Sequence, residues 1–405
     1  MTQPDLFGAV PAGRYLSFGD GPEAYRAFVP APLPPEIALD LDLVRTLSDA
    51  DRALGELAGL GRNLANPHLL IRPFLRREAV LSSRIEGTEA DLADVYAFEA
   101  EQQTRSASAG RGTDAREVHN YVVALEYGLE RLATLPVSVR LIREIHERLM
   151  AGVRGDQATP GEFRTVQNWI GPAGCGKHEA TYVPPPVPQM TEALYSLEGY
   201  LHAEDGYPPL VRLALSHYQF EAIHPFLDGN GRVGRLLMVL MLVEQNLLPL
   251  PLLYLSAYFE RHRQTYYDLL LGVSARGDWR AWVEFFLRGV AAEARDAVDR
   301  AKRLQDLRQS WRARLTEARV SAKLLEAADV LFERPILTIP QLQGLLGVHY
   351  NTARGYVEKM QEAGIVDQFG GDAYGRVYGA PLILDAISAP VEPAEGEARP
   401  TQSEG

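Results

Sequence analysis

The sequence predicts a mainly α-helical protein that ends in a winged-helix module. Over most of its 405 residues, apolar side chains recur at helical spacing, whereas strand-like alternation is weak and confined to the two ends. A hydrophobic content of 46% is ample for a sizeable core, and a chain of this length predicts two or three domains. No internal repeat is visible.

Composition and charge narrow the classes of partner. A formal net charge of -12 argues against broad, nonspecific affinity for nucleic acid or an anionic membrane. The apolar stretches fall short of the ~20 residues that a bilayer-spanning helix needs, so we expect no membrane contact. The single cysteine, Cys175, cannot form an internal disulfide, and the first residues lack the blocks of a secretory signal. Both features predict a cytoplasmic protein.

Changes in pattern divide the chain into five segments. Residues 1–100 are predicted to form an N-terminal helical region, whose Pro- and Gly-rich start follows the surface. Residues 101–303 are predicted to form the main helical core. A charged linker helix over 304–320 leads to a winged-helix domain at 321–388. The tail at 389–405 is rich in Pro, Glu and Gly, so we expect it to be disordered.

Helical periodicity also locates individual elements. The stretch LIRPFLRREAVLSSRIEG at 70–87 ends in Gly87, a typical helix C-cap. The stretch TRSASAGRGT at 104–113 is typical of a flexible loop. Helices are predicted over 36–100, 114–150, 187–201, 209–223 and 280–303, with another directly after the glycine-rich turn at 229–231.

The winged-helix prediction rests on the order of elements after residue 337. The stretch TIPQLQGLLGVHYNTARGYVEKMQEAGIV predicts a helix from Ile339, a turn at Gly347 and a second helix. The continuation DQFGGDAYGRVYGAP then predicts two short strands around a glycine-rich turn.

Two glycine-rich stretches are candidates for a phosphate site. The first, GPAGCGKH at 171–178, contains most of a P-loop, but His178 replaces the expected Ser or Thr. The segment that follows it, EATYVPPP, cannot begin a helix, so we expect a mobile surface loop. The second stretch, HPFLDGNGRVGR at 224–235, lies between two strongly apolar helical patterns. Its context therefore fits a helix N-terminus that binds phosphate.

The residues of this second stretch fit that chemistry. Pro225 ends the preceding helix, so His224 is presented at a helix end. The turn 229–231 leaves backbone N–H groups free to form an anion-binding nest, with Asp228 beside it. Arg232 and Arg235 lie on one face of the next helix and are expected to point at the same ligand. Together they indicate a nucleotide phosphate.

Here the sequence closely resembles the Fic family, whose motif consists of His, any residue, Phe, any residue, Asp or Glu, Gly-Asn-Gly-Arg, two residues of any kind, and Arg. Residues 224–235 contain every specified position. The resemblance extends through GEFRTVQNWIG, TYVPPP and LYLSAYFERHRQTYYDLL, and so covers most of 114–287. It implies a Fic helical core with a short β-hairpin flap. It also implies a protein adenylyltransferase that transfers AMP from ATP to a Tyr, Thr or Ser hydroxyl and releases pyrophosphate.

The resemblance implies roles for the motif residues. His224 would take the proton from the target hydroxyl, which suits a histidine whose pKa is near the ordinary 6.5. Asp228 would hold Mg²⁺, and Arg232 with Arg235 would neutralise the β- and γ-phosphates. The nucleotide-binding residues that it implies are Asp228, Gly229, Asn230, Gly231, Arg232, Arg235, Tyr266 and Tyr267.

Other assignments leave alternatives open. Thr181, Tyr182 and Val183 match a flap that positions the target by backbone pairing, although the prolines alone say only that the segment is extended. Tyr266 and Tyr267 match a tyrosine pair that lines the adenine pocket in relatives, although paired tyrosines are as often core residues. His217 is expected to be a packed, hydrogen-bonded histidine. The assignments of the flap and pocket residues therefore depend on the family resemblance.

The stretch SSRIEG at 82–87 matches the inhibitory motif of the family, Ser or Thr, three residues, Glu, then Gly or Asn. Ser82 and Glu86 share a helical face. In relatives this glutamate pairs with the second arginine of the motif, here Arg235, and prevents the γ-phosphate from seating productively. The motif alone is weak, since a surface glutamate is the ordinary alternative.

Other functions remain open at this point. The same fold in relatives transfers phosphate or phosphocholine, and removal of AMP with Glu86 aligning water is a further alternative. A nucleic-acid-binding regulator with a nucleotide-sensing core is another, because His349, Tyr350, Asn351 and Arg354 are placed to face a groove. Acidic residues outnumber basic ones in that module, which favours a protein partner or a homodimer contact at least as much. The sequence does not specify the target protein, and the chain itself is one candidate.

Overall fold

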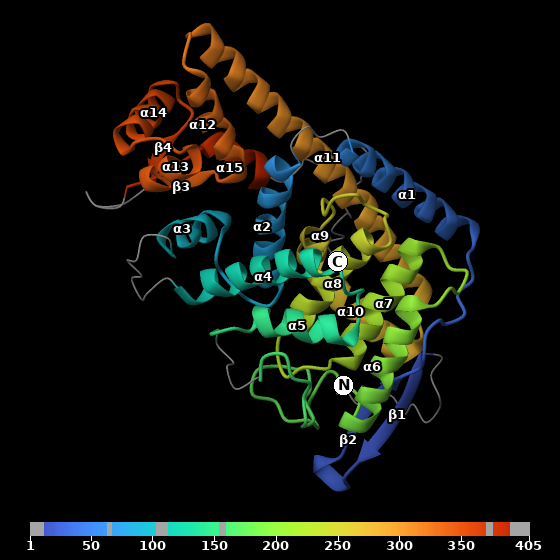
Figure 1. Cartoon of the computed structure of the whole chain (residues 1–405). Coiled ribbons are helices and arrows are strands. Elements are labelled where there is room, and N and C mark those ends of the chain that lie inside the picture. The colour runs from blue at the N-terminus through green and yellow to red at the C-terminus, as the bar shows by residue number, and fades with distance from the viewer. Residues whose placement is uncertain (1–11, 63–66, 103–111, 154–158, 370–375, 389–405) are drawn as a thin grey trace, which may run out of the picture.

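The computed structural model describes residues 12–62, 67–102, 112–153, 159–369 and 376–388. Within these ranges the chain has fifteen α-helices, a two-stranded sheet and a three-stranded sheet (Figure 1). The predicted mainly α-helical fold is therefore confirmed. None of the helices in the described ranges has the length and apolar character needed to cross a membrane. The predicted tail at 389–405 and most of the predicted loop at 104–113 lie outside the described residues.

The N-terminal segment forms a hairpin and does not simply follow the surface. Strands β1 (Gly13–Phe18) and β2 (Tyr25–Pro30) pair antiparallel, with Tyr15 opposite Phe28. Phe28 is fully buried, and its backbone N–H donates to the carbonyl of Val183 at 2.9 Å. Pairing satisfies the backbone polar groups that a surface-wrapping coil would leave to water. The hairpin lies at the end of the molecule away from the C-terminal module (Figure 1), and its hydrogen bond to Val183 joins it to the flap segment.

Five helices follow the hairpin. The expected helix over 114–150 is two helices, because the chain turns at 132–138 and Ser138 caps the second helix by accepting a hydrogen bond from Leu141 N. Pro136, within that turn, is incompatible with a continuous helix. Helix α1 packs along the long helix α11, described below. The five are α1 (Leu41–Arg62), α2 (His68–Ile85), α3 (Leu92–Gln102), α4 (Gly112–Arg131) and α5 (Val139–Leu149).

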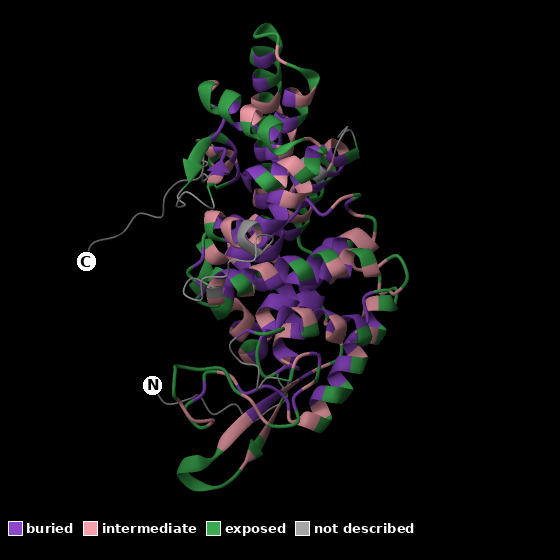
Figure 2. Cartoon of the chain, turned by 60° about the vertical axis from the view of Figure 1, so that its left-hand side comes forward, coloured by how far each residue is buried: buried purple, intermediate pink, exposed green. Residues whose placement is uncertain are grey.

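Helices α7 and α8 form the centre of the molecule. Most of their residues are buried on every side, which is why their sequences are almost continuously apolar. Figure 2 shows the buried residues concentrated in the middle of the helical core, with exposed residues on its outer turns. The helices of this part are α6 (Val187–His202), α7 (Pro209–Ile223), α8 (Asn230–Glu244), α9 (Ser256–Arg261) and α10 (Arg263–Arg276).

Helix α11 (Trp279–Glu317) is continuous over 39 residues. The sequence was expected to give a core helix to residue 303 and a separate linker helix over 304–320, but no Gly or Pro occurs between 290 and 317 to interrupt the hydrogen-bonding pattern. The helix therefore leaves the core and carries the C-terminal module directly, as Figure 1 shows.

The C-terminal module, predicted to be a winged helix, has its elements in the order helix, strand, helix, helix, strand, strand and helix. Its three strands are antiparallel in the order β3-β5-β4, and Thr338 and Gln341 form a capping box at the start of α13. Gly347, with φ of +63°, ends α13 as predicted. The turn between β4 and β5 lies partly outside the described residues. The elements are α12 (Ala322–Glu333), β3 (Ile336–Thr338), α13 (Ile339–Leu346), α14 (Tyr350–Glu362), β4 (Asp367–Phe369), β5 (Val377–Gly379) and α15 (Pro381–Ser388).

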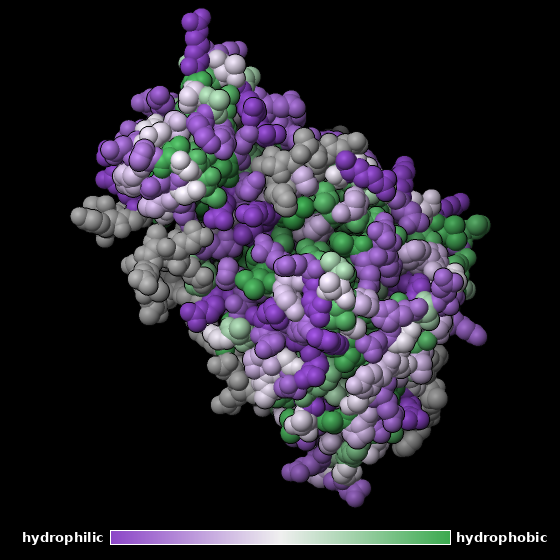
Figure 3. All heavy atoms as spheres, viewed as in Figure 1, coloured by the Kyte–Doolittle hydropathy of each residue, from purple (hydrophilic) through white to green (hydrophobic). Residues whose placement is uncertain are grey.

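This module packs against the N-terminal helices. Helices α12 and α15 contact α2, and strand β3 contacts α3. Helix α2 therefore contacts the C-terminal module as well as the helical core. On the face shown in Figure 3, polar residues cover most of the module and the core, and hydrophobic residues come to the surface in small groups.

We expect Trp282→Ala to lower the free energy of unfolding by about 3–5 kcal/mol, because it removes a large buried side chain. Trp282 is fully buried on α11, and its indole N–H donates to the carbonyl of Ala214 on α7 at 2.9 Å. Urea denaturation measures the effect. Tyr195→Ala is the control, since that side chain is 59% exposed and its loss should change stability by less than about 0.5 kcal/mol. Equal effects of both changes would contradict the packing of α11 on α7.

Candidate active site

His224 is held at the C-terminal end of α7 in an unusual backbone conformation. Its φ and ψ are 50° and 61°, in the left-handed region, and its N–H donates to the carbonyl of Phe220 at 3.0 Å. The buried side chain of Arg164 donates to the carbonyl of His224 at 3.0 Å. Such a conformation in a non-glycine residue persists only where its surroundings fix it. Arg164, which the sequence analysis did not identify, supplies part of that fixing.

The tautomer of the His224 ring follows from its contacts. Nδ1 lies 3.3 Å from the carbonyl oxygen of Glu221, which can only accept a hydrogen bond. Nδ1 therefore carries the proton, and Nε2 is left as the basic atom. Burial lowers the pKa of His224 to about 4. The ordinary value near 6.5 expected from the sequence is wrong here, because the surroundings disfavour the charged ring.

The turn between α7 and α8 is fixed by contacts on its inner side. Phe226 is fully buried and stacks on His146 with ring centres 3.7 Å apart. The Asn230 side chain accepts from Phe226 N at 2.8 Å and donates to Phe226 O at 2.9 Å. A side chain on Gly229, which has φ of +78°, would come within 2.9 Å of the sulfur of Met150. The Asn230 amide thus holds the turn, and only backbone groups of this residue are left for a ligand.

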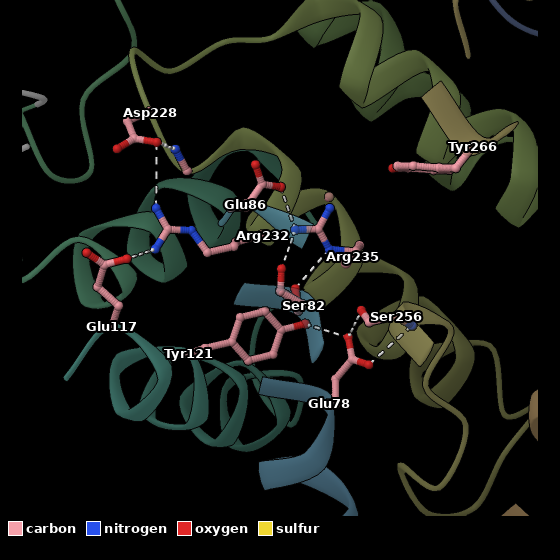
Figure 4. A network of polar contacts seen from close by, with 12 residues as sticks. Glu78, Ser82, Glu86, Glu117, Tyr121, Asp228, Arg232, Arg235, Ser256 and Tyr266 are labelled. Carbon is pink, nitrogen blue, oxygen red and sulfur yellow. Dashed lines mark hydrogen bonds and ion pairs between the residues drawn. The ribbon is translucent and has the colours of Figure 1, made fainter. Parts of the chain in front are cut away.

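Arg232 and Arg235 are held by different carboxylates (Figure 4). Arg232 is buried, 3.2 Å from Glu117 and 3.6 Å from Asp228, and it does not line the cavity described below. The expectation that both arginines point at one ligand is therefore not met in this arrangement. Their spacing places both on one side of α8, but Glu117 on α4 draws Arg232 away.

Arg235 is bound by the end of α2. It is 1% exposed, and its Nε donates to Ser82 Oγ at 2.8 Å. One terminal nitrogen donates to Ser82 O at 3.0 Å and to Glu86 Oε1 at 2.7 Å. Burial, the largest single influence, would raise the pKa of Glu86, but the charge and hydrogen bond of Arg235, together with the charge of Arg232, lower the pKa below its ordinary value. Ser82 and Glu86 thus meet Arg235 as the inhibitory motif implies.

A third residue of α2, Glu78, was missed by the sequence analysis. It is buried, accepts from Tyr121 Oη at 3.0 Å and accepts from both the hydroxyl and the backbone N–H of Ser256 (Figure 4). Burial raises its pKa to about 7. Glu78, Ser82 and Glu86 recur at every fourth residue, and that spacing on one helical face is the signal that could have identified it.

A cavity of about 420 Å³ is lined by several of the predicted site residues, but not by Asp228, Gly229, Asn230 or Arg232. One end holds polar groups of His224, Gly231, Arg235 and Glu86, and the rest is largely aromatic and aliphatic. Glu221, whose pKa burial raises to about 7, also lines it and was not identified from the sequence. The apolar lining residues include Tyr182, Tyr218, Tyr266, Tyr267, Leu270 and Leu271.

The predicted flap borders this cavity. Ile170 and Tyr182 form a single antiparallel bridge, with N···O distances of 2.8 and 3.0 Å, in place of a longer hairpin. Thr181 and Tyr182 line the cavity, whereas Val183 is buried below it and accepts from Phe28 N. The three predicted flap residues are therefore divided between the cavity and the core.

The tyrosine pair is also divided. Tyr266 is buried, and its hydroxyl lies 2.8 Å from Nε2 of His217. Tyr267 is 39% exposed, and both rings line the cavity. Burial lowers the pKa of His217 to about 3. The prediction that His217 is a packed, hydrogen-bonded histidine is confirmed.

A helical core that brings a histidine and a buried arginine to one cavity is the structural class of this protein, and sequence comparison gives the family. Residues 44–130 match the description "Fic/DOC family N-terminal", and residues 136–242 match "Fic/DOC family". The chain therefore contains both regions that define the Fic/DOC family, as its motif implied.

Named relatives agree with this assignment. The chain is 31% identical over 209 residues to proteins named "Protein adenylyltransferase Fic" from Culex quinquefasciatus and from Aedes aegypti. Each match covers 50% of this chain and 37% of the relative, so the chain matches well under half the length of these proteins. A crystal structure of a Fic family protein from Desulfovibrio desulfuricans G20 aligns over 86% of this chain and 98% of its own, with a TM-score of 0.52 and 23% identity. That structure supports the fold.

We expect His224 to stay neutral throughout the range from about pH 5.5 to 8, because burial holds its pKa near 4. Since the pKa is lowered, the charged ring forms only as the pH falls toward 4. NMR titration of ¹⁵N-labelled histidine measures this value, with His224→Gln used to assign the signal. A His224 signal that titrates near 6.5 would show that the ring is solvated.

Proposed function

We propose that this chain transfers AMP from ATP to a hydroxyl group of a protein. One observation carries the proposal: a single cavity joins a neutral histidine, the start of α8 and a buried arginine that already binds an anionic group. The Glu86 carboxylate marks a place where an anion pairs with Arg235. The names of the relatives support the type of reaction.

The proton transfer is assigned to His224. The target hydroxyl attacks the α-phosphorus of ATP, the new O–P bond forms as the bond to the β-phosphate oxygen breaks, and pyrophosphate leaves. The hydroxyl proton passes to Nε2 of His224, which is unprotonated because Nδ1 donates to Glu221 O. The neutral ring needs no prior loss of a proton at pH 7.

The phosphates are assigned to the start of α8. The first N–H groups of a helix lack partners within the helix and carry partial positive charge, so they suit an anion. Arg235 would pair with the terminal phosphates, and Arg232 adds positive charge behind the turn. No covalent enzyme intermediate is required, because positioning and charge neutralisation supply the catalysis.

Asp228 fits a role as the protein ligand of Mg²⁺. Its side chain is 52% exposed next to the turn, and one carboxylate is a common protein contribution when phosphates provide the other oxygens. In the described ranges, no group of three or more His, Cys, Asp or Glu residues is placed to hold a metal by itself. Bound with the nucleotide, Mg²⁺ would neutralise charge on the phosphate oxygens.

The rest of the cavity is assigned to the base and the target. Tyr266, Tyr267 and the neighbouring leucines provide an apolar surface for adenine. The edge at Ile170 and Tyr182 would pair with an extended segment of the target protein, which brings its hydroxyl to His224.

We further propose that Glu86 inhibits the reaction. Arg235 directs hydrogen bonds to Ser82 and Glu86, so a phosphate must displace the carboxylate to reach the same guanidinium. Glu78 and its partners Tyr121 and Ser256 hold α2 in place two turns before Glu86. Inhibition is then a competition between two anions for one buried cation.

We expect His224→Ala, made in a Glu86→Gly chain, to reduce AMP incorporation by about 10²- to 10⁴-fold and to leave ATP affinity nearly unchanged. The imidazole acts on the target hydroxyl and not on the phosphates. Incorporation from α-labelled ATP and calorimetry with MgATP measure the two effects. Labelling of this variant at the level of Glu86→Gly would exclude His224 as the base.

We expect Glu86→Gly to raise AMP incorporation by about 30- to 1000-fold, because it removes the competing anion. Arg235→Ala should not raise it, since this change also removes the phosphate contact. Glu89→Gly, just beyond the end of α2, is the matched control and should behave as the parent.

The assay uses α-labelled ATP at equal protein concentrations. An unchanged or lower incorporation by a folded Glu86→Gly chain would contradict the inhibition. Faster hydrolysis of an AMP-modified target by the parent than by Glu86→Gly would instead favour AMP removal.

A further inference from the structure

Three side chains of different chemical type, a phenol, a carboxyl group and an imidazole, follow one another along α7 and line the cavity. Tyr218, Glu221 and His224 follow one another at intervals of three residues, and all three line the cavity. Each interval advances about 4.5 Å along the helix. The Tyr218 hydroxyl lies 2.8 Å from Ser274 Oγ, and Leu270, Gly231 and Arg235 line the same cavity. Glu221 therefore lies between Tyr218 and His224 along α7.

The Glu221 carboxyl group has an unmet hydrogen-bonding capacity. Its Oε1 is inaccessible to solvent, and in the described part of the chain it has no hydrogen-bond partner. A buried polar atom of this kind costs free energy unless something pairs with it. Arg235 does not satisfy this atom, because its Nε donates to Ser82 and a terminal nitrogen donates to Glu86.

Helix α8 is shaped around this carboxyl group. A side-chain carbon added at Gly234 would lie 2.3 Å from Glu221 Oε1 and 3.2 Å from the Phe220 ring. Gly234 occupies one of the two unspecified positions in the motif, and its backbone conformation is ordinary helix, so conformation does not require glycine there. The space for the Glu221 carboxyl group does require it.

We propose that Glu221 binds a ribose hydroxyl of the nucleotide and so makes the cavity selective for ribonucleotides. The inference rests on the proposed function, because it assumes that a nucleotide spans the cavity. In a nucleotide the sugar lies between the base and the α-phosphate, as Glu221 lies between Tyr218 and His224. Carboxyl groups pair with sugar hydroxyls in other nucleotide sites, and a hydroxyl can both donate and accept.

Calorimetry with the Mg²⁺ complexes of ATP, 2′-deoxy-ATP and 3′-deoxy-ATP tests the proposal in the Glu86→Gly chain. We expect at least one deoxy nucleotide to bind about 10-fold or more weakly than ATP, as a lost hydrogen bond to a carboxyl group predicts. Adding Glu221→Ala should bring the ratio of the two dissociation constants close to one, by weakening ATP alone.

Two further variants separate hydrogen bonding from charge. Glu221→Gln removes the charge but keeps an acceptor and adds donors, so it should retain a clear preference for ATP. Glu192→Ala, an exposed glutamate on α6, should leave the ratio unchanged. Because Oε1 has no partner, Glu221→Ala is not expected to unfold the chain, and circular dichroism checks this.

The outcomes separate this inference from the proposed function. If ATP binds but Glu221→Ala retains the preference, or weakens ATP and the deoxy nucleotides equally, the ribose contact is wrong and nucleotide binding stands. If ATP and both deoxy nucleotides bind equally to the Glu86→Gly chain, the selectivity is likewise wrong. If a folded Glu86→Gly chain binds none of the three, both the proposed function and the ribose contact fail.

Discussion

The site depends on one buried cation, Arg235. A guanidinium that is 1% exposed cannot lose its proton, so it must have an anionic or strongly accepting partner at all times. In this structure Glu86 and Ser82 supply that partner from α2. The requirement to satisfy this one charge therefore ties the end of α2 to α8 at the cavity.

The surrounding helices place Arg235, its partner Glu86 and His224 at one cavity. Helix α7 ends at His224, whose strained conformation is held by Arg164, and α8 begins within the same turn. Phe226 and Asn230 fill the inside of that turn. Because these contacts fix the turn from inside and from neighbouring elements, a ligand would meet preorganised backbone groups and would not have to order them.

Helix α2 also connects the site to the C-terminal module. Arg72, one turn into α2, lies 3.8 Å from Glu333 at the end of α12, whereas Glu86 lies at the opposite end of α2, at the cavity. Between them Glu78 is bound by Tyr121 and Ser256 of the core. The same helix is thus held at the module, at the core and at the site, so the placement of Glu86 is set by packing along its whole length.

Local backbone restrictions and short periodic patterns were enough to predict the helical fold, the end of α7 at Pro225, the turn at 229–231 and the spacing of Ser82 and Glu86. The same local signals extend to the unbroken α11, which has no Gly or Pro between 290 and 317, and to Glu78, which shares the four-residue spacing of α2. The tertiary structure alone decided that Arg232 pairs with Glu117, that the Asn230 side chain is directed inward, that the pKa of His224 is lowered and that Glu221 lies at the site. Burial and pairing depend on residues far apart in the chain, such as Arg164 beside His224 and Gly234 beside Glu221, and only the packing of helices brings those residues together.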